Sequence, residues 1–220
     1  MIRKNRGEIS WLEFELLQKA KVKHAVFLKQ SSEVTKFDWF EEIVYFNQVH
    51  GKEIALIEKR GEILRADGGI TKMKEIPLAI KHADCQAAIF YDPVQNVLAN
   101  VHAGWRGLVQ NIYRETVEKM VKEFCVDKDN LVVCIGPSLE PNHSEFIHYK
   151  QEFPKSFWRF QVKPNYFNLW DIAKFQLREL GVPLRNIEVA EIGTYGNCKD
   201  FYSYRRDKTV NRNVTVAALS

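Results

Sequence analysis

The sequence predicts a mixed α/β fold, and three observations support that class. Several short segments are rich in Val, Ile, Phe and Tyr, which is typical of strands. Other segments carry apolar residues at helical spacing. The two kinds of segment alternate irregularly over 220 residues, which favours a layered fold with a mixed sheet. We find no internal repeat, low-complexity tract or long linker, so we expect a single domain over residues 1–220.

The composition is that of an ordinary globular chain, with 45% hydrophobic and 27% charged residues. The net charge of +4 comes from 32 basic and 28 acidic residues spread along the chain, so we expect no nucleic-acid surface, which would need a cluster of basic residues. No stretch approaches the ~20 apolar residues of a membrane helix, and the first residues lack the features of a secretory signal. No two cysteines form a CxxC pair, so we expect reduced thiols and a cytoplasmic protein; the cysteines are Cys85, Cys125, Cys134 and Cys198.

The first half of the chain predicts one helix followed by strands. Residues 8–22 predict a short amphipathic helix, because apolar residues recur at helical spacing: Ile9, Leu12, Leu16, Leu17 and Ala20. Segments 23–29, 41–50 and 53–58 predict strands. After the turn "RADGG", residues 76–92 predict two buried strands that meet at "HADC".

The second half predicts two longer helices between further strands. Residues 97–103 form a strand-like run, and residues 108–124 carry apolar positions at helical spacing. A buried strand is expected over 130–136. A second helix is expected to begin at Asn168, with an acidic residue three positions later as in a capping box, and to end at Gly181. The tail returns to strand character.

Three potential metal ligands each end a strand-like run: His50, Cys85 and His102. The separations of 35 and 17 residues are too long for a local zinc finger but suit three neighbouring strand ends. Two imidazoles and a thiolate match a catalytic zinc centre with an open fourth position, and the same donors suit copper. Glycines near the ligands let the backbone turn sharply and approach a bound group; they are Gly51, Gly104 and Gly107.

The turn "VHAGWRG" also carries two large side chains that an ordinary turn does not need. Arg106 stands beside the start of a predicted helix, where backbone N–H groups favour an anion, and its planar fork suits phosphate. We expect Trp105 to pack beneath the turn, with stacking on a base as the alternative. Asp84, next to Cys85, is interpreted as a proton carrier or as a group that orients the ligand.

Five strings in the chain resemble the YfiH family of laccase-domain proteins: "QVHG", "ADC", "HAGWRG", "IGPSLEP" and "FYSYRRD". They occur in order over about four-fifths of the chain. The resemblance implies two β-sheets between outer helices, a layered α/β/β/α sandwich with mixed sheets. It also implies a metal site at His50, Cys85 and His102, usually holding zinc, with copper as the other possible ion.

Members of this family were first labelled multicopper polyphenol oxidases and are better described as purine nucleoside phosphorylases that also deaminate adenosine; some are peptidoglycan editing factors. The resemblance therefore implies an enzyme acting on a nucleoside (adenosine, inosine or methylthioadenosine) and phosphate. The spread of charge and the lack of a long apolar run predict no nucleic-acid or membrane partner. Cys85 and Asp84 are the expected catalytic residues. Among the paired arginines of "YSYRRD", Arg205 is expected to contact substrate together with Arg106, although Arg206 and Arg212 remain alternatives.

The chain also departs from the family pattern, and the departures concern the substrate rather than the metal. Lys29 or Gln30 stands where the family has an arginine, so Lys29 is expected to supply charge to the substrate without the guanidinium fork. His82 replaces a common threonine, and we interpret it as lying behind the ligands. His143 is interpreted as lying at the surface or behind the ligands.

Three other functions stay open. A cysteine hydrolase would use Cys85 as a nucleophile activated by His102 or His50, as in the cytotoxic necrotizing factor type of enzyme, whose fold is similar. A copper oxidase acting on phenols would need more histidines than the six present. A non-catalytic module would bind metal without turning over any nucleoside.

Overall fold

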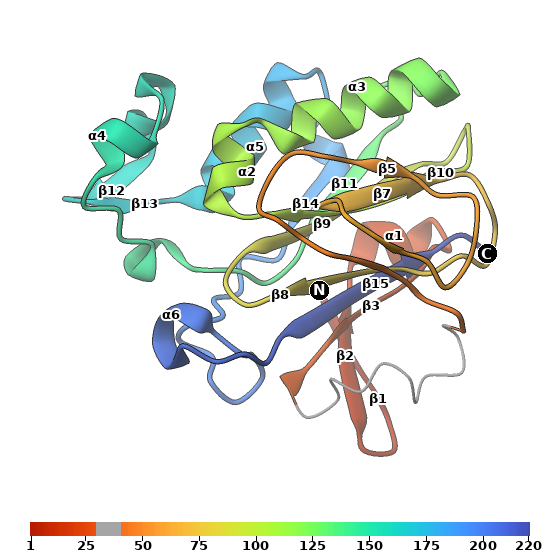
Figure 1. Ribbon diagram of the computed structural model, residues 1–220, viewed down its shortest axis with the longest axis horizontal. Coiled ribbons are helices and arrows are strands. Elements are labelled where there is room, and N and C mark those ends of the chain that lie inside the picture. The colour runs from red at the N-terminus through yellow and green to blue at the C-terminus, as the bar shows by residue number, and fades with distance from the viewer. Residues whose placement is uncertain (30–40) are drawn as a thin grey trace.

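Two β-sheets lie face to face in the computed structural model, which describes residues 1–29 and 41–220 (Figure 1). Within the described residues one sheet has seven strands, in the order β1 (Ile2–Arg6), β2 (Ile9–Glu13), β3 (Lys23–Phe27), β15 (Asn213–Ala218), β8 (Leu78–His82), β4 (Val44–Phe46) and β6 (Ile63–Leu64). The other has six, in the order β14 (Ile187–Val189), β11 (Val132–Ile135), β9 (Gln86–Asp92), β10 (Val97–Ala103), β7 (Gly68–Thr71) and β5 (Ala55–Leu56).

Both sheets mix parallel and antiparallel pairing. Strand β10 is antiparallel to β9 and to β7, whereas β11 is parallel to β14. In the seven-stranded sheet, β15 is antiparallel to β3 and β8, whereas β4 runs parallel to β8 and β6. The predicted mixed α/β class with mixed sheets is confirmed.

Helices cover the six-stranded sheet on the side away from the other sheet (Figure 1). They are α2 (Trp105–Val109), α3 (Ile112–Phe124) and α5 (Leu169–Glu179). The largest apolar cluster fills the space between these helices and the sheet, and a second one joins the inner faces of the two sheets near α1 (Glu15–Lys19). The shorter elements α4 (Tyr149–Glu152), β12 (Gln161–Lys163), β13 (Tyr166–Phe167) and α6 (Tyr204–Asp207) lie beside the ends of the strands. Among the described helices, none is long and apolar enough to span a membrane.

The predicted helix over residues 8–22 is wrong in its first half. Residues Ile9–Glu13 form strand β2, which pairs with both β1 and β3, and only Glu15–Lys19 is helical. Trp11 lies opposite Phe27 in the ladder and is 4% exposed. The apolar spacing fits a helix, but cross-strand packing and ladder hydrogen bonds decide the conformation, as tertiary context often does.

The predicted helix over residues 108–124 is two helices. It begins earlier, at Trp105, and breaks after α2 at Asn111, whose φ of 59° is left-handed. The Asn111 side chain accepts a hydrogen bond from the N–H of Arg114 and so caps α3. Helix α5 begins and is capped as predicted, because Asn168 accepts the N–H groups of Trp170 and Asp171.

The tail is only partly strand. Strands β14 and β15 occur where strand character was expected, but Tyr204–Asp207, the last part of the "YSYRRD" stretch between them, forms helix α6. The Ser203 hydroxyl accepts the N–H of Arg206, so a polar cap starts a helical turn there.

Candidate metal centre and its two cavities

The side chains of His50, Cys85 and His102 meet at one edge of the two sheets. Their ligand atoms all lie within 4.8 Å of one another. The topology brings them together: β10 pairs with β9 so that His102 lies opposite Ala87, two residues beyond Cys85. His50 follows β4, and its ring meets the His102 ring edge to face, with centroids 4.9 Å apart.

Gly104 closes one side of this cluster. A Cβ atom at this position would stand 3.1 Å from Cδ2 of His50 and 3.2 Å from Sγ of Cys85. Both distances are shorter than ordinary van der Waals contact, so only glycine leaves the two side chains where they lie. The sequence expectation that a glycine here permits close approach agrees with this contact.

The buried carboxylate of Asp67 organises two of the three side chains. One oxygen, Oδ1, accepts hydrogen bonds from Nδ1 of His102 at 2.9 Å and from the N–H of His50 at 2.9 Å. The other, Oδ2, accepts the N–H groups of Gly51 at 2.7 Å and Val49 at 3.3 Å. A carboxylate only accepts, so Nδ1 of His102 carries a proton and Nε2 is left for the cluster.

Asp67 also explains the backbone of the ligand loop. His50 has a φ of 58°, in the left-handed region that few residues other than glycine adopt. Three consecutive N–H groups of this loop point at one carboxylate, which offsets the cost of that conformation. From its sequence "RADGG" is predicted only as a turn, because an aspartate before two glycines is typical of turns and nothing local indicates a histidine 35 residues away.

The electrostatics of the cluster favour a thiolate beside an imidazolium. Burial alone would lower the pKa of His102, but hydrogen bonds with Asp67 and Cys85 raise it to about 9. Burial alone would raise the pKa of Cys85, but hydrogen bonds with His102 and His50 lower it to about 6. Burial lowers the pKa of His82 to about 3, so that ring stays neutral.

This donor set could hold a metal ion. Metal–donor bonds of about 2.0–2.3 Å let one ion bridge atoms up to roughly 4.6 Å apart, close to the span of the cluster. The thiolate form of Cys85 is the form that ligates, and His102 must release its second proton to do so.

A cavity of about 470 Å³ opens beside the cluster and has an aromatic wall. The rings of Trp105 and Phe146 meet edge to face at 5.8 Å, and Trp105 also contacts Phe153 at 6.0 Å. Trp105 therefore packs beneath the turn, as expected, and also lines this first cavity. The guanidinium of Arg106 lies 4.2 Å from the centre of the Trp105 ring.

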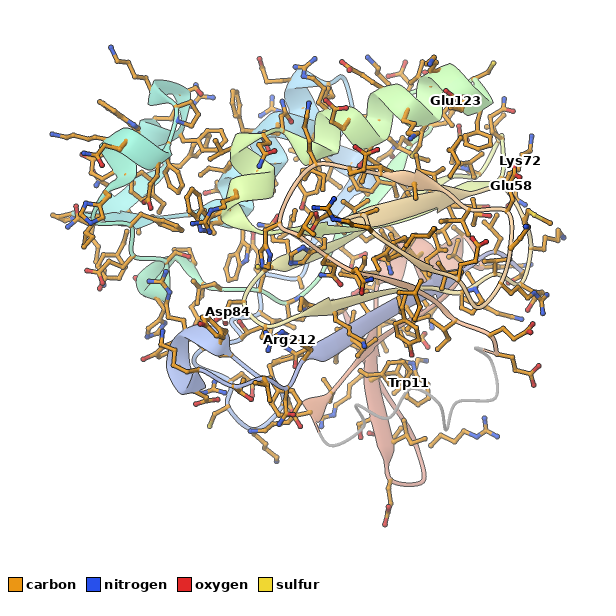
Figure 2. The ribbon with its side chains drawn as sticks, in the orientation of Figure 1. Trp11, Glu58, Lys72, Asp84, Glu123 and Arg212 are labelled. Atoms are coloured by element: carbon orange, nitrogen blue, oxygen red, sulfur yellow. The ribbon has the colours of Figure 1, made fainter. Side chains whose placement is uncertain are left out.

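A second cavity, of about 740 Å³, approaches the cluster from another side. It is lined by Val49, Lys81 and Arg212, and it shares His50, Cys85 and Tyr204 with the first. The cluster is thus accessible from both cavities. Arg212 lies at the start of β15 and Asp84 beside helix α6 (Figure 2).

Asp84 joins the cysteine turn to helix α6. Its carboxylate accepts the hydroxyl of Thr194 at 2.8 Å and the N–H of Arg205 at 2.6 Å. Its φ of 84° is left-handed. Because both oxygens already accept hydrogen bonds, this geometry fits the orienting role better than that of proton carrier.

The three C-terminal arginines have different surroundings. Arg205 lines the first cavity, and its guanidinium donates to the carbonyl of Glu145 at 3.0 Å. The Arg206 guanidinium donates instead to three backbone carbonyls, those of Thr194, Tyr195 and Phe201. Arg206 therefore fixes the loop before α6, whereas Arg205 and Arg212 face cavities.

Lys29 lies apart from the cluster. Its ammonium contacts the carbonyl of Cys198 at 3.5 Å and the Tyr202 ring, with 5.1 Å to the ring centre. It is not among the residues that line the two cavities. Its contact with substrate therefore stays a prediction, and the position of its side chain does not support it. Gln30, the alternative at this position, lies outside the described residues.

The two histidines expected at the surface or behind the ligands differ in burial. His82 is 1% exposed and its Nε2 lies 3.0 Å from the Thr215 hydroxyl. His143 lies further out, stacked on Tyr195 with ring centroids 3.9 Å apart. Several residues that line the first cavity have no signal in the sequence, since each resembles an ordinary core or surface position: Gln86, Phe146, Leu169, Tyr204 and Lys208.

Comparison with known proteins places these features in a family context. The profile of a family described as multi-copper polyphenol oxidoreductase laccase matches residues 19–220. A purine nucleoside phosphorylase of Bacteroides thetaiotaomicron is 32% identical over 185 residues, covering 76% of this chain and 68% of that protein. One from Campylobacter jejuni is 30% identical over 184 residues, covering 83% and 80%. The crystal structure of the Bacillus licheniformis hypothetical protein YfiH superposes with a TM-score of 0.85 at 20% identity, covering 99% of each chain.

Replacing Asp67 with asparagine is expected to weaken zinc binding by about 10–100-fold. An amide has one acceptor oxygen, so two of the four donors that Asp67 accepts lose their partner. Competition titration against a chromophoric chelator measures the affinity. Asp92→Asn serves as the control, because Asp92 is equally buried but accepts the N–H groups of Val94 and Gln95 in a distant turn. Equal losses in the two variants would contradict the role given to Asp67.

Gly104→Ala is expected to lower zinc affinity on the order of tenfold, because the new methyl group pushes His50 and Cys85 apart. The protein should stay folded, since the backbone at Gly104 (φ −73°, ψ 170°) is ordinary for alanine. The same titration is applied to Gly136→Ala, where the nearest atom stands at 3.4 Å. Unchanged affinity in Gly104→Ala would show that the cluster has more room than this contact indicates.

Proposed function

The chain belongs to the multi-copper polyphenol oxidoreductase laccase family, the YfiH family, and we propose that it is a zinc-dependent purine nucleoside phosphorylase. One observation carries the proposal: the cluster of His50, Cys85 and His102 opens on a cavity with an aromatic wall and a cationic rim. Relatives at 30–32% identity that are purine nucleoside phosphorylases support the same reaction.

The first cavity suits a nucleoside and an anion together. Its volume of about 470 Å³ lies within the ~300–1,000 Å³ of small-molecule sites. We place the purine against Trp105 and Phe146, whose rings offer apolar faces for stacking. Arg106, Arg205 and Lys208 line the same cavity and supply the positive charge that phosphate requires.

In phosphorolysis an oxygen of phosphate forms a bond to the anomeric carbon of the ribose while the bond to the purine nitrogen breaks. The electron pair of that bond leaves with the purine, which takes up a proton. The cationic side chains hold the phosphate against the sugar. His102, fixed by Asp67 through Nδ1, and His50 hold the thiolate side of the cavity in place.

Zinc is the ion we assign to the cluster, because three nitrogen and sulfur ligands with an accessible side are typical of catalytic zinc. When bound, it supplies a Lewis acid and lowers the pKa of water to about 7. We further propose that adenosine is deaminated in the same cavity: the oxygen of a water molecule forms a bond to the purine carbon that carries the exocyclic amine, and the amine takes up a proton and leaves as ammonia. Asp84 holds the Cys85 turn against helix α6 during both reactions.

The purified protein with zinc and phosphate is expected to convert adenosine or inosine to the free base and ribose 1-phosphate. Chromatography of the reaction mixture measures the free base that is formed. Cys85→Ala should lose at least about 100-fold in rate, because it removes a ligand and leaves two. Lys29→Ala should keep most of the activity, since Lys29 does not line the cavity. If neither free base nor inosine is produced from any purine nucleoside, the proposed function is wrong.

A cysteine hydrolase is the second candidate, because two histidines flank Cys85 and hold the pKa of its thiol at about 6. A copper oxidase has less support: within the described residues, the only group of three or more potential ligands of this kind is this cluster, and a multicopper enzyme needs more histidine ligands than the chain has.

Iodoacetamide is expected to label Cys85 at pH 7 in protein treated with chelator. The thiolate is present above its pKa of about 6, so labelling should fall as the pH is lowered through 6. Buried Cys134 is the internal control, because burial raises its pKa. Peptide mass spectrometry reads both sites. Zinc should protect Cys85 from labelling by iodoacetamide. If zinc protects Cys85 but also inhibits the enzymatic activity of the protein, the cysteine hydrolase is favoured instead.

A further inference from the structure

Gln86, the residue after Cys85, has an amide whose orientation is fixed. Its Nε2 donates to the backbone carbonyl of Leu169 at 3.0 Å, and its Oε1 lies 2.6 Å from the Tyr113 hydroxyl. A backbone carbonyl can only accept, so the nitrogen must face Leu169. The Tyr113 hydroxyl therefore donates to Oε1, and the amide cannot turn over without losing both bonds.

The partners that fix Gln86 come from two helices and are themselves buried. Tyr113 on α3 is 0% exposed, and burial raises its pKa, so it stays a neutral donor. Leu169 begins α5. Buried polar groups of this kind hold one arrangement because breaking a bond leaves an unsatisfied atom.

Gln86 also lines the first cavity, although its side chain is only 2% exposed. Opposite it in the sheet lies Ala103, and Leu169 and Phe146 line the same cavity. Ser138 also lines this cavity, and its hydroxyl already accepts the indole N–H of Trp170. Gln86 keeps one N–H and one oxygen lone pair beyond the two bonds described.

We propose that Gln86 selects the base and binds 6-aminopurines in preference to 6-oxopurines. This proposal rests on the proposed function, because the proposed function assigns the first cavity to a purine. An amide presents a donor and an acceptor side by side. The edge of adenine offers N7 as acceptor and the exocyclic amine as donor, which is the pairing that glutamine makes with adenine.

A 6-oxopurine offers two acceptors on the same edge, N7 and O6. One of them then faces Oε1 of Gln86, and the hydrogen bonds to Tyr113 and Leu169 hold that oxygen in place. Tyr113 is thus a positioning residue for base selection, acting through Gln86 rather than by touching the purine.

The experiment is calorimetric binding of the free bases adenine and hypoxanthine to the zinc-loaded protein without phosphate, so that no turnover occurs. The wild-type protein should bind adenine about tenfold more tightly. Gln86→Met should abolish that preference, and Tyr113→Phe should reduce it because the bond to Leu169 alone then holds the amide. Tyr113→Phe removes a single hydroxyl and keeps the ring in the core.

Two controls separate selection from general loss of structure. Gln176→Met removes another buried amide, one that donates to the carbonyl of Leu108 and does not line the cavity. Tyr91→Phe removes a hydroxyl from the same strand as Gln86. Both should keep the preference for adenine.

Equal binding of the two bases by the wild-type protein, or binding of neither, overturns the proposal. So does an unchanged preference in both Gln86→Met and Tyr113→Phe. A wild-type protein that prefers adenine but cleaves no nucleoside would sustain the role of Gln86 in base selection while the proposed phosphorylase function failed.

Discussion

The carboxylate of Asp67 is the interaction on which the rest of the site depends. It accepts four hydrogen bonds from two segments that the chain sequence keeps apart, the ligand loop at His50 and the strand that carries His102. In doing so it fixes the tautomer of one imidazole and the backbone of the other. A charged acceptor inside the protein gives hydrogen bonds of more than ordinary strength, so a single side chain can hold a loop in a left-handed conformation and a ring in one orientation.

The two halves of the site differ in construction. The three potential ligands lie at or near strand ends, where the sheet pairing of β9 with β10 places two of them side by side. The far wall of the first cavity comes from short elements, with Trp105 and Arg106 on α2 and Tyr204 and Arg205 on α6. The cluster at the strand ends thus lies across the first cavity from side chains of the short helices α2 and α6.

The sequence predicted the cluster because its residues combine unusual chemistry with a strand-end position. His50, Cys85 and His102 carry donors that few strand ends need, and Gly104 stands next to one of them. Asp67 and Gln86 gave no such signal, since one looks like a turn aspartate and the other like the first residue of a strand. Their functions arise from contacts 35 and 27 residues away along the chain, with His102 and Tyr113. The segment before β3 was misassigned for a similar reason, because spacing alone does not reveal that Trp11 has a cross-strand partner.

Helix α6 is fastened to the cluster through its main chain. Asp84, next to Cys85, accepts the backbone N–H of Arg205, and Ser203 caps the helix itself by accepting the backbone N–H of Arg206. A main-chain N–H is present whatever side chain a residue carries, apart from proline. The side chains at positions 204, 205 and 208 can therefore be exchanged during evolution while the helix keeps its position beside Cys85. Enzymes with this arrangement can therefore change the substrate that their cavity binds without changing the cluster of His50, Cys85 and His102.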